Sequence, residues 1–215
     1  MAKNKSNFTK SLVLLIVTAL FSVLATVVDR AAIGYNDTVV GFSTLNGAFH
    51  NQFGYNEIFD TISDVAMGLA FLVVISFAIM GVMQLIRERK FSKVDKAILG
   101  LGVLYVVIAV IYVAFGKIPI NYRPILQPGE TELETSFPST HTLIIVTVLG
   151  SAILAWNKLL KNKSLVKILK CLALVVIVVG TAARLFAGVH WATDIVAGIL
   201  FSLTLISLYA ACSLD

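Results

Sequence analysis

The chain has 215 residues, of which 58% are hydrophobic and only 13% are charged, and its formal net charge is +5 at pH 7. This composition excludes an ordinary soluble domain, because soluble domains carry about a quarter charged residues. We therefore expect an all-α, polytopic membrane protein in which residues 1–215 form a single domain.

Six apolar stretches are long enough to cross a bilayer, since a transmembrane helix needs about 20 mostly apolar residues. The fifth stretch is less clean than the others, because Lys167 and Lys170 lie near its start, where their long stems let the charge reach the interface. The predicted helices are residues 12–28, 66–86, 97–115, 140–158, 165–183 and 193–213.

The basic residues indicate how these helices are oriented. Thirteen of the 17 lie in the N-terminal segment, in the loop after the second helix or in the loop after the fourth. The positive-inside rule places these segments in the cytoplasm, with both termini, and the other loops outside the cell membrane. Because the cations are spread over three short loops, they indicate topology and not nucleic-acid binding.

Between the first two helices, four apolar residues recur at helical spacing in a polar background. They are Phe42, Leu45, Phe49 and Phe53. The spacing predicts either a helix lying in the membrane interface beside a functional site or an outer helix packed on the bundle.

The segment between the third and fourth helices contains all four prolines, which predicts an irregular outer loop. It ends in "PSTHT", where Ser139 is a good N-cap for the fourth helix. The first backbone N–H groups of that helix would then point outward and form an anion site. In the alternative, Ser139 only caps the helix and His141 only lies at the interface.

The stretch "RLFAGVHWATD" places three ionisable residues next to the last helix. If His190 begins that helix, Asp194 lies one turn further along the same face and can accept a hydrogen bond from the imidazole. The other ring nitrogen would then be free as a nucleophile, and Arg184 could bind two phosphoryl oxygens. In the alternative, Arg184 and Asp194 form an interfacial salt bridge.

These motifs resemble the three signatures of the type 2 phosphatidate phosphatase family, which is related to vanadium haloperoxidases. Arg184, His190 and Asp194 keep the spacing of the third signature: Ser-Arg, five residues, His, three residues, Asp. The "PSTH" at residues 138–141 is similar to the Pro-Ser-Gly-His of the second signature, and "NYRP" resembles the end of the first: Lys, six residues, Arg-Pro.

The sequence departs from these signatures at three positions. Five residues lie between Lys117 and Arg123 instead of six, Thr140 stands in place of the glycine, and Ala183 stands in place of the serine. The shifted spacing weakens the expectation for Lys117 as a phosphate ligand, and the change at Ala183 removes one hydroxyl group.

The resemblance implies an acid-phosphatase/haloperoxidase-like helical bundle that hydrolyses a lipid phosphate. His190, oriented by Asp194, would attack phosphorus and form a phosphohistidine, while His141 would protonate the leaving oxygen. The expected phosphate-binding residues are Arg123, Arg184, Ser139, Thr140 and Lys117.

The same pattern predicts the cofactor and the substrate class. We expect no cofactor and no metal ion, because cationic side chains would bind the phosphate and the sequence has no carboxylate cluster of the kind magnesium prefers. The substrate is expected to be a lipid phosphate such as phosphatidate or phosphatidylglycerophosphate, or a polyprenyl diphosphate. A non-catalytic lipid-phosphate carrier that keeps the anion site is the alternative.

Overall fold

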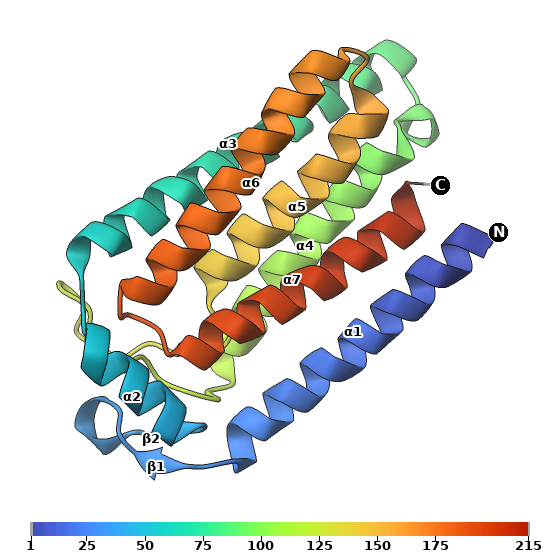
Figure 1. Ribbon diagram of the computed structural model, residues 1–215. Coiled ribbons are helices and arrows are strands. Elements are labelled where there is room, and N and C mark those ends of the chain that lie inside the picture. The colour runs from blue at the N-terminus through green and yellow to red at the C-terminus, as the bar shows by residue number, and fades with distance from the viewer. Residues whose placement is uncertain (1, 215) are drawn as a thin grey trace.

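The computed structural model describes residues 2–214, with side chains from residue 7 onward. Helices dominate the fold, and a two-residue antiparallel ribbon follows the first of them (Figure 1). The helices and strands are α1 (Ala2–Val27), β1 (Ala31–Ala32), β2 (Val39–Val40), α2 (Ser43–Phe53), α3 (Glu57–Glu88), α4 (Lys96–Lys117), α5 (Thr140–Leu159), α6 (Lys163–Phe186) and α7 (Ala192–Ser213). Short 3-10 turns at Tyr35–Asp37 and Phe91–Lys93 complete the described elements.

The six predicted membrane helices are confirmed as α1 and α3 to α7, each long and apolar enough to span a bilayer. Their ends differ from the expectation, and α3, for example, starts at Glu57 and not at residue 66. The side chain of Asn56 accepts hydrogen bonds from the backbone N–H groups of Ile58 and Phe59, and an acidic first turn suits the helix dipole. The first turns of α3 therefore contain charged residues, and a prediction based on uncharged stretches starts the helix too late.

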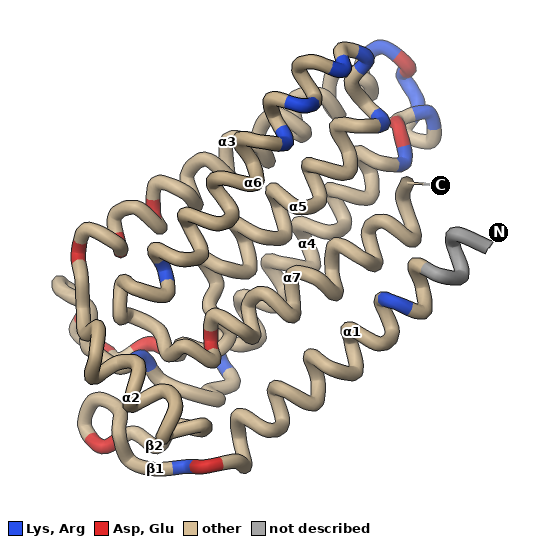
Figure 2. The backbone as a smooth tube through the Cα atoms, in the orientation of Figure 1, with Lys and Arg blue, Asp and Glu red and all other residues tan. Residues whose placement is uncertain are grey.

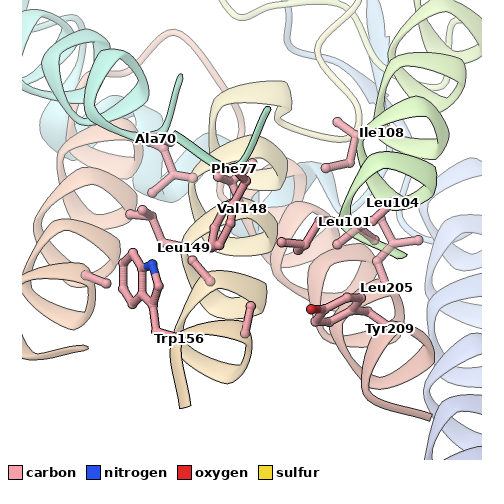
Figure 3. Close-up of a cluster of buried hydrophobic side chains, with 14 of the residues drawn as sticks. Ala70, Phe77, Leu101, Leu104, Ile108, Val148, Leu149, Trp156, Leu205 and Tyr209 are labelled. Atoms are coloured by element: carbon pink, nitrogen blue, oxygen red, sulfur yellow. The ribbon is translucent and has the colours of Figure 1, made fainter. Parts of the chain in front are cut away.

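The helix α5 lies at the centre of the bundle and packs against α3, α4, α6 and α7. Figure 3 shows apolar side chains from α3, α4, α5 and α7 meeting around it. The rings of Phe77 and Trp156 stack with centroids 6.3 Å apart, and the hydroxyl of Tyr209 donates to the carbonyl of Ala97 at 3.1 Å. The core is thus fixed by packing on α5 and by a few buried polar contacts.

The outward faces of the other helices are apolar and exposed. Val103, Val106 and Val110 of α4 and Val178 of α6 are each more than 60% exposed. Exposed apolar surface on this scale is typical of a face that contacts lipid. The chain is therefore a multi-pass membrane protein.

The helix α2 lies across one end of the bundle, as Figure 1 shows. The rings of Phe49 and Phe53 both pack against Phe186 of α6, with centroids 6.0 Å and 5.1 Å apart. Leu45 remains 58% exposed. The segment therefore packs on the bundle, which is one of the two expectations for it, and α2 keeps an exposed side.

Charge is distributed unevenly along the bundle. Figure 2 shows Lys and Arg gathered at the end where both chain termini lie, along the α3–α4 and α5–α6 connections. At the opposite end, basic and acidic residues are mixed. The predicted site residues lie at this mixed end.

Candidate active site

Two hydrogen bonds hold the elements of the site together at the end of the bundle away from the termini. The backbone N–H of Ser139 donates to the carbonyl of Asp194 at 3.0 Å, which joins the starts of α5 and α7. The indole Nε1 of Trp191 donates to the carbonyl of Tyr122 at 2.7 Å, which joins the α4–α5 connection to the start of α7. The three predicted motifs, far apart in sequence, thus meet in one region.

His190 lies two residues before α7 and not at its first position, because the connection from α6 turns at Gly188 with φ +71°. Its Nδ1 is 3.7 Å from Oδ2 of Asp194, which is close enough for an ion pair but too long for a hydrogen bond. The carboxylate of Asp194 instead accepts hydrogen bonds from the backbone N–H of Trp191 at 3.0 Å and from Nδ2 of Asn121 at 3.2 Å. The expected hydrogen bond between His190 and Asp194 is absent from the described structure.

The imidazole of His190 is almost fully buried, with 1% of the side chain exposed. Burial lowers its pKa well below the ordinary value of 6.5, and the positive charges of Arg184 and Arg123 lower it further. His190 is therefore neutral at neutral pH, with a nitrogen lone pair available.

The start of α5 matches the predicted cap. The hydroxyl of Ser139 accepts a hydrogen bond from the backbone N–H of Thr142 at 3.4 Å, and Thr140 is the first helical residue. His141 follows, with Nε2 2.8 Å from Oδ1 of Asp64 on α3. The second histidine of the site thus has a carboxylate partner from a helix that contributed no predicted site residue.

Each of the two predicted arginines also has a carboxylate partner. Nη2 of Arg123 lies 2.8 Å from Oε2 of Glu134 in the same connection. Nη1 of Arg184 bonds Oδ1 of Asp60 on α3 at 2.5 Å. The alternative salt bridge between Arg184 and Asp194 is wrong, because the first turns of α3 reach Arg184 instead.

Several buried nitrogen atoms of the site have no hydrogen-bond partner among the described residues. They are Nε and Nη1 of Arg123, Nε of Arg184 and, apart from an interaction with the backbone of Ser136, the ring nitrogens of His190. Buried polar groups in folded proteins are nearly always paired, so such a concentration calls for an explanation. Guanidinium groups and a histidine in this state match a ligand with several anionic oxygens.

A cavity of about 1080 Å³ adjoins these residues. Lys117, Arg123, Thr140, His141 and His190 contribute to its polar end. Its apolar wall comes from α3, α4 and α5 and includes Met67, Phe71, Val74, Tyr105, Ile108, Tyr112 and Ile144. Glu132 and Glu134 line the same cavity. The cavity therefore joins a polar end, where basic and acidic side chains lie together, to a cleft between membrane-spanning helices.

Three predicted site residues do not line the cavity. Ser139, Arg184 and Asp194 lie behind it, with at most 1% of each residue exposed. In this structure they support the lining residues, Ser139 as the cap of α5 and Asp194 as the anchor of the chain before α7.

The sequence patterns missed the acidic partners of the site. The expected second helix starts at residue 66 and leaves out Asp60 and Asp64, although their i, i+4 spacing and the capping residue Asn56 indicate one helix face. Asn121 and Glu134 also went unrecognised, and no pattern in the sequence pairs them with Asp194 and Arg123.

The fold and the site define a class: a membrane-spanning helical bundle with a buried cluster of histidine and arginine at one end. Residues 117–215 match the family model of the PAP2 superfamily. This match confirms the resemblance of this part of the chain to type 2 phosphatidate phosphatases.

One solved structure extends the likeness to almost the whole chain. It is the crystal structure of the first transmembrane PAP2 type phosphatidylglycerolphosphate phosphatase from Bacillus subtilis, with 18% sequence identity and a TM-score of 0.62 over 93% of this chain and 94% of that one. At this identity the likeness shows the fold, which is that of a transmembrane PAP2 protein. A search of curated protein sequences found no match.

Proposed function

We propose that the protein is a membrane lipid phosphatase that hydrolyses a lipid phosphate or a polyprenyl diphosphate through a phosphohistidine. The observation that carries this proposal is the group of buried, unpartnered nitrogens of Arg123, Arg184 and His190 beside the cavity. A phosphoryl group supplies oxygens for the guanidinium groups and an electrophilic phosphorus for the imidazole.

In the proposed reaction, Nε2 of His190 attacks phosphorus in line with the leaving oxygen. An N–P bond forms while the P–O bond to the lipid breaks, and His141 gives its proton to the departing oxygen. The phosphoimidazole that results carries positive charge, which Asp194 stabilises from 3.7 Å. Water then attacks the phosphorus, His141 takes its proton, and inorganic phosphate leaves with His190 restored.

The phosphate ligands in this proposal are the residues at the polar end of the cavity and their supports. Arg123 and Lys117 line the cavity, and the backbone N–H of Thr140 opens the positive end of α5. The unpartnered Nε of Arg184 and the hydroxyl of Ser139 complete the set. These groups balance negative charge without a metal ion, so the activity should persist in a chelator.

The apolar part of the cavity favours a lipid substrate. A second cavity of about 260 Å³ shares Val74 and Tyr105 with the first and continues between α3 and α4. A lipid chain could leave the polar end along this cleft while its phosphate stays at the membrane surface. The apolar walls suit acyl chains and isoprenoid chains alike.

The charge distribution favours an extracytoplasmic site. The cationic end of the bundle also carries both termini, and the site lies at the other end (Figure 2). By the positive-inside rule, the termini are cytoplasmic and the site faces outward.

A lipid-phosphate binder or carrier without turnover is the second candidate, because the departures at Lys117, Thr140 and Ala183 affect ligand contacts. Phosphate release from a panel of lipid phosphates in detergent with EDTA separates the two, with His190→Ala as the comparison. The phosphatase proposal requires turnover by the native chain and none by His190→Ala. Binding without release, or equal release by both proteins, would contradict it.

A further inference from the structure

The first two turns of α3 bring two carboxylates to the site. Asp60 and Asp64 lie one turn apart on the helix, so they share a face. Asp60 contacts Arg184 and Asp64 contacts His141. Both belong to the part of the chain before residue 117, outside the region that matches the family model.

Asp64 differs from the other two carboxylates of the site in the kind of residue that it pairs with. Asp60 and Glu134 each pair with a guanidinium group, which keeps its positive charge throughout a reaction. Asp64 pairs with His141, which loses its positive charge when it protonates a leaving group. Among these three carboxylates, only Asp64 loses the positive charge of its partner when His141 gives up its proton.

Geometry places the leaving group close to Asp64. When His141 is protonated, Nε2 lies 2.8 Å from Oδ1 of Asp64 and can donate to it, while Nδ1 is buried without a partner and has a second N–H to give to a leaving oxygen. The two ring nitrogens are about 2 Å apart, so the leaving oxygen lies within about 8 Å of Oδ1 of Asp64 at either nitrogen. Over such a distance, negative charges repel strongly even near a protein surface.

We propose that Asp64 is a specificity-determining residue that favours a neutral alcohol as the leaving group and disfavours a leaving phosphate. This inference rests on the proposed phosphatase function and makes the preferred substrate a lipid phosphomonoester. When a monoester is cleaved, the leaving group departs as an uncharged alcohol after proton transfer. When a diphosphate is cleaved, it departs as a lipid phosphate whose negative charge faces Asp64.

The test compares two substrates that share one lipid chain, farnesyl monophosphate and farnesyl diphosphate, in detergent micelles. Initial rates of phosphate release give kcat/KM for each substrate, before the monophosphate product of the diphosphate is itself consumed. Asp64→Asn keeps the size of the side chain and removes its charge, and Asp64 is 60% exposed, so the exchange is mild. Glu57→Gln, an exposed change on the same helix, is the matched control.

We expect the native protein to prefer the monophosphate. Asp64→Asn should raise the diphosphate-to-monophosphate ratio of kcat/KM on the order of 10-fold or more, with a gain in diphosphate turnover, and Glu57→Gln should leave the ratio unchanged. A defect in folding would lower both rates and could not produce this gain. An unchanged or lowered ratio in Asp64→Asn overturns the inference while phosphatase activity stands.

The proposed function fails in a different way in the same experiment. If the native protein releases no phosphate from either substrate, or if His190→Ala releases as much, the phosphatase proposal falls and the role of Asp64 falls with it. A native preference for the diphosphate would overturn the role of Asp64 alone.

Discussion

The turn before His190 depends on a glycine, and replacing Gly188 with alanine should damage both stability and activity. Gly188 has φ +71°, a conformation that side chains with a Cβ rarely adopt. An alanine Cβ here would lie 1.8 Å from the carbonyl oxygen of Gly54 and 3.0 Å from the Cα of Tyr55. The connection between α2 and α3 therefore presses directly on this turn.

The size of the effect follows from this geometry. Ordinary van der Waals contact begins at 3.4 Å, and the added Cβ would lie 1.8 Å from the oxygen of Gly54. The turn at Gly188 and the α2–α3 connection must therefore move apart by about 1.6 Å. The left-handed backbone costs alanine about 1–2 kcal/mol, and separation also breaks the hydrogen bond from the N–H of Asn56 to the carbonyl of Ala187 at 3.0 Å, worth about 1 kcal/mol. Misplacing His190, the proposed nucleophile, by more than about 1 Å can cost about 100-fold in rate.

We therefore expect Gly188→Ala to lose about 2–3 kcal/mol of stability and about 100-fold in kcat/KM. Gly129→Ala is the matched control, because Gly129 also has a positive φ of +87° but has nothing within 4 Å of an added Cβ. Thermal unfolding in detergent and phosphate release from a lipid phosphate measure the two effects. If Gly188→Ala and Gly129→Ala behave alike, the close contact with Gly54 does not hold the turn.

Three further predictions concern the site and its orientation. Arg123→Ala should lower kcat/KM about 100-fold, because it removes a charge-assisted phosphoryl contact, and Lys117→Ala should cost less; equal losses would contradict the assumed loop geometry. Because the pKa of His190 is lowered, its lone pair persists as pH falls, so the acidic limb of a kcat/KM profile should lie below pH 6.5; a limb above that value would refute a neutral nucleophile. On intact cells, an impermeant thiol reagent should label a cysteine placed at Glu130 but not one at Lys161, in a background without native cysteines; the reverse pattern would invert the topology.

Much of the fold could be predicted because the bilayer imposes simple rules on a sequence. A helix must satisfy its own backbone and needs about 20 apolar residues, so uncharged runs locate membrane spans. The same rule misjudged the start of α3, where Asp60 and Asp64 lie inside a helix but pair with side chains of other helices. Tertiary pairing of this kind leaves no trace in local hydrophobicity.

The site was predictable where spacing along one segment carries the information. The motif from Arg184 to Asp194 gave residues that do lie together, since the α6–α7 connection is short. The expected hydrogen bond between His190 and Asp194 is absent, because the turn at Gly188 places His190 before the helix and Asp194 accepts a hydrogen bond from the backbone of Trp191. Backbone hydrogen bonds at a helix start compete for a carboxylate, and sequence spacing cannot tell which partner prevails.

The contacts across the molecule imply that residues 117–215 do not build the whole site by themselves. The amide of Asn46 on α2 donates to the hydroxyl of Thr193 at 2.8 Å, and its oxygen accepts from the backbone N–H of Thr193 at 3.2 Å. These bonds fasten α2 to the first turn of α7, beside Asp194. Together with the contact of Gly54 on Gly188, they fix the path of the chain through His190. The earlier helices therefore act on the site in two ways: α2 and its connection to α3 hold His190, the proposed nucleophile, in place, and α3 supplies Asp64, the carboxylate that we propose faces the leaving group.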